Sequence, residues 1–245
     1  MLKKILSLAI TLALCLAIAP LTALAAVTLS LERDIYGPWK LWSLGKRNEQ
    51  TASDSLSGEI ALADALGLIP DCLNGKDLTK SITRAEFAAV SVKLYEVLSG
   101  TEALPVSINP FTDTDDIEVM KAYNVGITDG TAPGKFSPDM RISREQVAVM
   151  LTRVYKRVTM EGWTLANDRN FTLQYVKPGR FGDDGEISEW AKDSVYFMAT
   201  NSIILGTGNN MFTPRAATTA ENAVGYAKRE QALAIAVRVV KKFGD

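Results

Sequence analysis

The sequence has 245 residues, with 27 basic and 28 acidic side chains and no histidine. The lack of histidine excludes Ser-His-Asp and Cys-His catalysis and histidine-ligated zinc sites. The near balance of charge gives no support for nucleic-acid binding through bulk positive charge, so we expect no nucleic-acid partner.

A secretory signal peptide is predicted at residues 1–25. Lys3 and Lys4 precede an apolar run from residue 5 to residue 18, and Ala23-Leu24-Ala25 offers small residues where a signal peptidase cuts. A retained transmembrane helix is the alternative, and Pro20 counts against it because it interrupts the run. We therefore expect cleavage after residue 25 and no membrane span in the mature chain.

The mature chain would lose the two lysines of the signal peptide, which leaves 25 basic residues against 28 acidic ones and a net charge of −3. Cys72 would be its one cysteine, so no intrachain disulfide is expected. Residues 26–54 form an N-terminal segment and linker, with a short alternating stretch at 27–31 that predicts a strand. Within this segment, Trp39 and Trp42 either pack against the domain or offer a sugar-stacking face.

A helix-start motif recurs along the rest of the chain. Residues 82–87 read Ile-Thr-Arg-Ala-Glu-Phe, residues 142–147 read Ile-Ser-Arg-Glu-Gln-Val, and residues 228–232 read Lys-Arg-Glu-Gln-Ala. The first two copies are capping boxes, in which a Thr or Ser caps the helix and a Glu or Gln reaches back to the cap. In every copy an arginine takes the first helical position, beside N–H groups without intrahelical partners and the positive end of the helix dipole. Such a position favours a bound carboxylate or phosphate.

The residues that follow each arginine predict a helix of roughly 15 residues with one apolar stripe, because apolar side chains recur every three or four positions. We expect these stripes to form the core. They are Phe87, Val90, Leu94 and Leu98 in the first helix, Val147, Met150, Val154 and Val158 in the second, and Ala232, Ile235, Val239 and Phe243 in the third.

A turn-rich loop precedes each of the last two long helices. The spacing from Gly130 to Phe136 equals that from Gly206 to Phe212. Glycine supplies positive-φ turns, and we expect each phenylalanine to plug the core. A shorter helix is predicted before each loop, and a Phe-x-Asp motif introduces it, at Phe111 and at Phe181.

These features divide the chain into three tandem repeats, an abbreviated first and an expanded third. The connection at residues 159–179 can pair as a small β ribbon through residues 163–165 and 171–175. The third repeat carries an insertion at residues 215–226. Repeat 1 covers residues 55–100, repeat 2 residues 109–158 and repeat 3 residues 180–245.

The order of motifs in these repeats resembles the S-layer homology (SLH) domain, which usually occurs in three tandem copies. The motifs are, in order, Phe-x-Asp, Trp-Ala, a Gly-rich loop, Phe-Ser/Thr-Pro and Ile-Thr-Arg-Ala-Glu. The resemblance implies a mainly all-α fold of pseudo-threefold symmetry, in which one helix of each repeat meets in a central bundle and grooves lie between the lobes. It also implies noncovalent anchoring to secondary cell-wall polysaccharide, which often bears pyruvate ketals on N-acetylmannosamine. The corresponding location is the cell surface of a secreting, Gram-positive type of bacterium.

The resemblance places the ligand-contacting arginine of the family on Arg84, Arg144 and Arg229. A ketal pyruvate is a carboxylate on a sugar, and the planar guanidinium fork of arginine suits it. We rank Arg229 below the other two, because repeat 3 lacks a Ser or Thr cap and carries the insertion. An aromatic side chain would stack on the sugar, and glycines would let the backbone approach it. The expected glycan contacts are Arg84, Arg144, Arg229, Trp190, Gly130, Gly206 and Gly208.

Each candidate also has a purely structural explanation. The arginines could form surface salt bridges or ties between lobes, and Trp190 could pack in the core against Phe181 and Phe197. Asp113 and Asp183 could cap helices or turns. A calcium site at these aspartates is a weaker alternative, because the twelve-residue order of an EF-hand and its terminal Glu are missing.

Two other functions compete with glycan binding. A glycosidase would use paired carboxylates, but the acidic residues lie at helix-start and turn positions where they have ordinary roles. A structural S-layer or envelope adaptor would use the same grooves for protein–protein contacts without glycan. We expect no enzyme, no catalytic residue, no metal and no cofactor. The oligomeric state is not predicted.

Overall fold

The computed structural model describes residues 51–216 and 224–244. The predicted signal peptide, the 27–31 stretch, Trp39 and Trp42 lie outside the described residues, as do residues 217–223 of the insertion. The α-helices of the described part are α3 (Ser57–Ala65), α4 (Arg84–Ser99), α5 (Ile117–Asn124), α6 (Arg144–Thr159), α7 (Lys192–Thr200) and α8 (Arg229–Phe243). Short 3-10 turns cover Asp54–Leu56, Asp71–Leu73, Leu165–Asn170 and Asp184–Glu186.

The long helices α4, α6 and α8 begin where the repeated motif predicts. Thr83 caps α4 and Ser143 caps α6, each in a complete capping box with the residue at the third helical position. The cap of α8 keeps only half of this arrangement. The Lys228 N–H donates to Gln231 at 3.0 Å, but the ammonium group of lysine carries no acceptor for the return bond.

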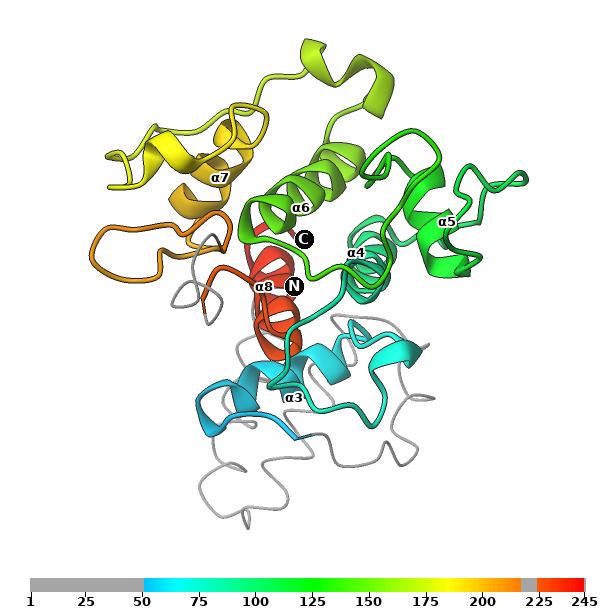
Figure 1. The fold of residues 1–245 in the computed structure, drawn as a ribbon, viewed down its shortest axis with the longest axis horizontal. Helices are drawn as coiled ribbons and strands as arrows, with labels where there is room; N and C mark the ends of the chain where they lie inside the picture. The colour runs from blue at the N-terminus through cyan, green and yellow to red at the C-terminus, as the bar shows by residue number, and fades with distance from the viewer. Residues whose placement is uncertain (1–50, 217–223, 245) are drawn as a thin grey trace, which may run out of the picture. The chain divides into compact units, whose positions relative to one another are not determined.

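The long helices form a central bundle, as expected (Figure 1). Helix α4 packs against both α6 and α8, and the rings of Tyr155 on α6 and Phe243 on α8 lie 4.5 Å apart. The predicted apolar stripes are the core of this bundle. Their first three positions are buried in every helix, and Leu98, Val158 and Phe243 at the last position are partly buried against it. The described residues thus have the all-α architecture that the sequence predicts.

The short helices pack in an exchanged pattern around this bundle (Figure 1). Helix α5 of repeat 2 packs on α4 of repeat 1, and α7 of repeat 3 packs on α6 of repeat 2. Helix α3 of repeat 1 completes the circle by packing on α8 of repeat 3. Because every short helix covers the long helix of a different repeat, each repeat depends on another for its core.

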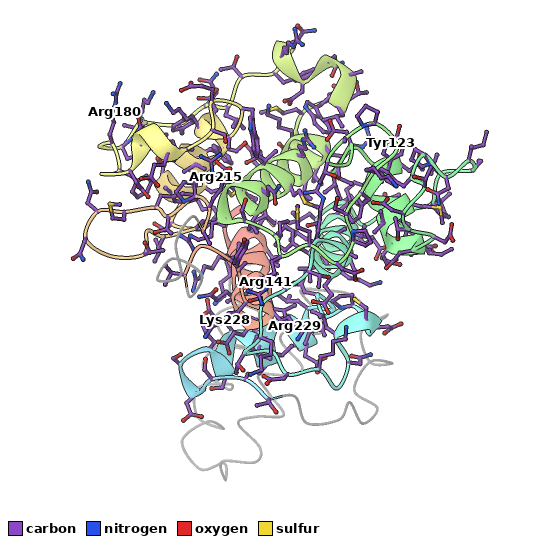
Figure 2. All side chains as sticks on the ribbon, in the orientation of Figure 1. Tyr123, Arg141, Arg180, Arg215, Lys228 and Arg229 are labelled. Carbon is purple, nitrogen blue, oxygen red and sulfur yellow. The ribbon has the colours of Figure 1, made fainter. Side chains whose placement is uncertain are left out.

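The segments that lead into the long helices also join one another. The Ile82 N–H donates to the Ala227 carbonyl at 2.9 Å, and the Ile142 N–H donates to the Ile82 carbonyl at 3.4 Å. Figure 2 labels Arg141, Lys228 and Arg229 at this junction. Isolated antiparallel bridges complete it, between Ser81 and Lys228, Thr83 and Arg141, and Ser143 and Tyr226.

The predicted β ribbon in the connection is wrong. Residues 165–170 form a 3-10 turn, and residues 171–175 have no strand partner. Trp163 is instead buried at 1% exposure, and its indole N–H donates to Asp168 at 2.7 Å. Asp168 also accepts from Lys156 of α6 at 2.6 Å, so the connection is held as a loop against α6.

Within residues 51–216 and 224–244, no helix has the length and apolar character that a membrane crossing requires.

We predict that Phe136→Ala lowers the free energy of unfolding by about 3–5 kcal/mol, as measured by urea denaturation. Phe136 is fully buried, its ring lies 5.4 Å from that of Phe111, and the Arg84 guanidinium lies 5.0 Å from its centroid. Ile108→Ala is the control, because that side chain is 82% exposed and its loss should change stability by less than about 0.5 kcal/mol. Equal effects of the two substitutions would contradict the assignment of Phe136 to the core.

Candidate functional site

The first-turn N–H groups of α4 are already bonded and do not wait for a ligand. Arg84 N–H donates to the Met140 carbonyl at 2.8 Å, and Ala85 N–H donates to the Pro138 carbonyl at 3.0 Å. The sequence interpretation of a free N–H ring beside this arginine is therefore wrong, because the loop of the neighbouring repeat supplies the acceptors. The same pattern recurs at Glu145 N–H to Pro214, Arg229 N–H to Lys80, and Glu230 N–H to Leu78.

Arg84 reaches from the start of α4 into repeat 2. Its Nη2 donates to Thr128 Oγ1 at 3.0 Å and to the Gly130 carbonyl at 3.1 Å. The side chain is 5% exposed, and its Nε is buried without a hydrogen-bond partner in the described part of the chain. Arg84 is thus a tie between two repeats, and one of its donor groups is unsatisfied.

Arg144 makes the equivalent reach from α6 into repeat 3. Its Nε donates to the Phe212 carbonyl at 2.9 Å, and its Nη2 donates to the Leu205 carbonyl at 2.6 Å. The guanidinium lies 5.0 Å from the Phe212 ring centroid, the same distance as between Arg84 and Phe136. Both arginines therefore bond to uncharged groups of the next loop and lie over its phenylalanine.

Arg229 closes the circle by reaching from α8 into repeat 1, but its partners differ. Its Nη1 donates to the Asp77 carbonyl at 2.9 Å. Its Nε and Nη2 donate to the two carboxylate oxygens of Glu86, each at 2.9 Å. Arg229 is thus neutralised by an internal carboxylate, whereas Arg84 and Arg144 make no ion pair within the described residues.

Burial of the two unpaired arginines has an electrostatic cost. Burial lowers the pKa of Arg84, and the nearby Arg153 lowers it further. Burial lowers the pKa of Arg144 to about 10, against a smaller opposing effect of Asp183. Both guanidinium groups stay protonated at neutral pH, so each is a desolvated positive charge that an incoming anion would stabilise.

The Arg84 groove has a volume of about 630 Å³. Its wall combines Arg84 and Gly130 with Gln146 and Arg153 of α6, and Trp190 of repeat 3 also lines it. Arg153 pairs with Asp129 at 3.1 Å and Lys156 pairs with Asp168 at 2.6 Å. Among the described residues that line this groove, Arg84 is therefore the cation without a carboxylate partner. The groove therefore joins residues of all three predicted repeats around one arginine.

The Arg144 groove is a smaller copy, with a volume of about 270 Å³. Arg144 and Gly206 line it, and Ser55 lies two residues before α3 just as Trp190 lies two residues before α7. The long helices contribute the same helical positions to both grooves: Gln146, Val149, Met150 and Arg153 from α6, and Gln231, Ala234, Ile235 and Arg238 from α8.

The structure places the remaining predicted contacts in two classes. Trp190 is 60% exposed and lines the Arg84 groove, so it is not a core residue. Gly130 and Gly206 line their grooves, but both are required by their own loops: an added Cβ would lie 2.5 Å from the Lys135 carbonyl oxygen or 2.7 Å from the Met211 carbonyl oxygen. Gly208 has a φ of +105° in open space and is not among the residues that line either groove.

Asp113 and Asp183 hold the loops through backbone hydrogen bonds. Asp113 accepts from the N–H groups of Phe136 and Ser137 at 2.9 and 3.0 Å, and Asp183 accepts from those of Phe212 and Thr213 at 2.8 and 2.6 Å. Asp116, not Asp113, caps the helix that follows. In residues 51–216 and 224–244, no group of three or more candidate metal ligands comes together.

Sequence reasoning missed the importance of the third helical position. It treated Glu86 and Gln146 only as capping partners and gave Gln231 no role, although the three side chains border the three arginines. It also missed Glu145 and Glu230, which are buried and accept from the N–H groups that precede α7 and α3, those of Ser188 and Ser53. A comparison of the three helix starts would have shown that repeat 1 alone has a carboxylate at the third position.

Comparison with known proteins identifies a protein family that parts of this chain match. The family model of the S-layer homology domain matches residues 110–148 and 180–219. These matches cover the Phe-x-Asp motifs, the short helices and the loops of predicted repeats 2 and 3. Predicted repeat 1, which has neither the Phe-x-Asp motif nor the Gly-rich loop, lies outside them.

Three curated proteins are similar to this chain over part of their length. An amylopullulanase of Thermoanaerobacterium thermosulfurigenes is 28% identical over 166 residues, which is 68% of this chain and 8% of that protein. The exoglucanase XynX of Acetivibrio thermocellus is 28% identical over 164 residues, 67% of this chain and 13% of that protein. An endoglucanase of Bacillus sp. (strain KSM-635) is 31% identical over 146 residues, 58% of this chain and 14% of that protein. The chain thus spans only a small fraction of each enzyme.

We predict that Asp113→Asn destabilises the protein at neutral pH and that the difference from wild type disappears in acid. The hydrogen bonds from Phe136 and Ser137 lower the pKa of the Asp113 carboxyl. A lowered pKa contributes stability that is fully present above the unfolded value of about 3.9 and is lost as the pH falls through the folded value. Urea unfolding between pH 2 and pH 7 measures this.

The control is Asp139→Asn, at an exposed position of the same loop whose carboxylate accepts no hydrogen bond from the part of the chain that the structure describes. It should leave the pH profile of unfolding unchanged. A pH-independent difference between Asp113→Asn and wild type would contradict the clamp role of the carboxylate.

Proposed function

We propose, from the premise that this chain is an S-layer homology domain protein, that it anchors a secreted protein to the bacterial cell wall by binding an anionic glycan. The glycan would be a secondary cell-wall polysaccharide, and its pyruvate ketals would be the groups recognised. The chain itself would perform no chemistry. The enzyme names of its relatives belong to those much longer proteins.

One observation carries this proposal: Arg84 is buried and Arg144 partly buried, neither is paired with a carboxylate of the described residues, and each lines a groove between repeats. Hydrogen bonds from a guanidinium to a carboxylate are about twice as strong as neutral ones. An anionic sugar substituent would therefore gain a charge-assisted contact and relieve the desolvation of the arginine.

The Arg84 groove offers the more complete site. Its volume falls in the range of about 300–1,000 Å³ that is usual for small-molecule pockets. Trp190 gives it an exposed aromatic ring that a pyranose can cover. The Arg144 groove has Ser55 in place of that ring, so we expect it to bind the same group more weakly. Two weak sites on one rigid body would add through avidity on a repetitive polymer.

A protein–protein adaptor without glycan binding is the second candidate. The exposed Trp190 would also suit a protein partner, because aromatic residues are enriched at interfaces. The two candidates differ in what removes binding: extraction of wall polysaccharide, or of its pyruvate alone, lowers retention only in the glycan account.

We predict that Arg84→Ala together with Arg144→Ala abolishes pelleting with purified cell-wall sacculi. The physical reason is the loss of the two unpaired guanidinium groups. Arg169→Ala together with Arg180→Ala is the charge-matched control, since both side chains are exposed and Arg180 projects outward (Figure 2). The control pair should pellet like wild type, and unchanged pelleting of the first pair would remove the site assignment.

The buried ties of Arg84 and Arg144 make a test of folding necessary, so circular dichroism accompanies the assay. Trp190→Ala provides a variant outside the core, which should keep wild-type helicity and lose retention several-fold. Wild-type retention by this variant would argue against stacking in the Arg84 groove.

A further inference from the structure

The third position of each long helix decides whether the neighbouring arginine is paired. Glu86 takes this position in α4, Gln146 in α6 and Gln231 in α8. Each side chain uses one oxygen to accept from the N–H of its own helix cap, at 3.0, 3.2 and 3.0 Å respectively. The hydrogen bond to the helix cap is thus the same in all three helices. The helices differ in the second group of the side chain, which is a carboxylate oxygen in Glu86 and an amide NH₂ in the two glutamines.

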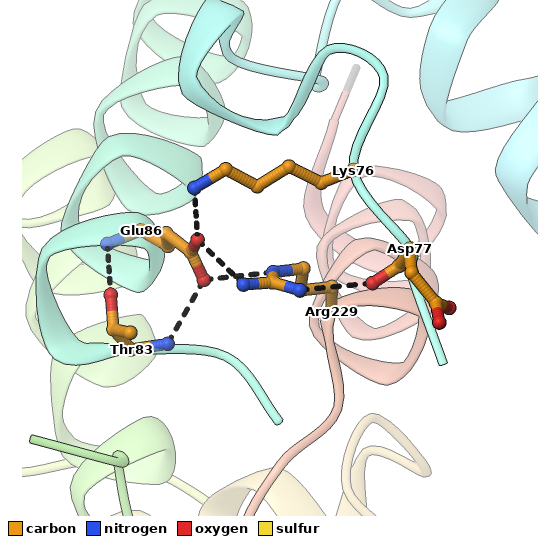
Figure 3. Close-up of polar contacts among 5 residues, drawn as sticks. All are labelled: Lys76, Asp77, Thr83, Glu86 and Arg229. Carbon is orange, nitrogen blue, oxygen red and sulfur yellow. Dashed lines mark hydrogen bonds and ion pairs between the residues drawn. The ribbon is translucent and has the colours of Figure 1, made fainter. Parts of the chain in front are cut away.

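Glu86 presents a carboxylate to Arg229 (Figure 3). The two oxygens accept one guanidinium hydrogen bond each, at 2.9 Å, in a bidentate pair. Lys76 adds a third cationic donor at 2.7 Å. The Glu86 side chain is 7% exposed and that of Arg229 is 14% exposed, so this pair is largely removed from solvent.

Gln146 and Gln231 cannot do the same. Once the amide oxygen accepts from the cap, the remaining NH₂ group is a donor and offers nothing to a guanidinium. Arg84 and Arg144 accordingly bond to backbone carbonyls and a hydroxyl and keep their charge unpaired. The same glutamines line the Arg84 and Arg144 grooves.

We infer that the Glu86 carboxylate stands in for the carboxylate of the ligand, so that the Arg229 interface is occupied by the chain itself and the protein binds with two grooves. Glutamine at the third helical position leaves an interface open to an anionic sugar, and glutamate closes it. This inference rests on the proposed function, because it specifies which interfaces take the anionic group.

The closure follows from the cost of replacing one carboxylate by another. A ligand that took Arg229 would leave Glu86 buried beside Lys76 without its bidentate partner. Removing one partner of a buried ion pair is strongly destabilising, whereas the ligand would gain only the contact that Glu86 loses. The exchange therefore gives no net driving force, in contrast to the unpaired Arg84 and Arg144.

The test is the number of sites for a methyl glycoside of pyruvylated N-acetylmannosamine, measured by isothermal titration calorimetry on the mature chain. Wild type should bind two molecules, and Glu86→Gln should bind three. Glu86→Gln should fold, since glutamine already completes the cap bond at this position in α6 and α8. The converse variants Gln146→Glu and Gln231→Glu should each bind one, and the double variant should bind none.

The outcomes separate the two levels of the account. No binding by wild type would overturn the proposed function itself. Binding of three molecules by wild type, or of two by a folded Glu86→Gln variant, would overturn the closure by Glu86 and leave glycan binding intact. Should Glu86→Gln not fold, the converse variants decide, because retention of two sites in either of them contradicts the inference.

Discussion

The rest of the structure depends on one interaction: the arginine at the first position of each long helix forms hydrogen bonds with a different repeat. Arg84 bonds into repeat 2, Arg144 into repeat 3 and Arg229 into repeat 1. The short helices follow the same order, because each packs on the long helix of the preceding repeat. The repeats are therefore not three independent units that each carry an arginine on the surface. The arginines link the three repeats in a closed cycle, in which the core of each repeat includes a helix of another.

The same ties explain why two of the interfaces suit an anionic ligand. A guanidinium that crosses between repeats must leave water, and backbone carbonyls replace its hydration without neutralising its charge. Arg84 and Arg144 are in this state, at the edge of grooves that the exchanged packing leaves open. Arg229 shows the other solution, an internal carboxylate that satisfies the charge and leaves nothing for a ligand. The position of Arg84 and Arg144 between repeats thus explains both their structural role and their proposed role in binding.

Much of the fold could be predicted from the sequence. The apolar stripes, which recur three times, and the capping boxes of the first two copies placed α4, α6 and α8, since both signals are local. The exchanged packing could not be predicted, because periodicity shows which face of a helix is buried but not which helix covers it. The predicted ribbon at residues 163–165 and 171–175 was wrong for a related reason: two short stretches of sequence cannot distinguish paired strands from a loop anchored by a buried Trp163.

The candidate site was predictable in its residue types and not in its geometry. The recurrence singled out the arginines, and the structure places Arg84, Gly130 and Trp190 in one groove, although they come from three repeats. The structure alone shows that the first-turn N–H groups of α4 donate to the carbonyls of Met140 and Pro138. The sequence could not predict these bonds, because the acceptors lie more than fifty residues away along the chain. The pairing of Glu86 with Arg229 is likewise a contact between two repeats.

The most direct measurement is a crystal structure of the protein from crystals soaked with the methyl glycoside of pyruvylated N-acetylmannosamine. The account predicts the ligand carboxylate within hydrogen-bond distance of the guanidinium groups of Arg84 and Arg144, with the Glu86–Arg229 pair unbroken. A ligand bound at Arg229 with Glu86 displaced, or bound away from all three arginines, would contradict it.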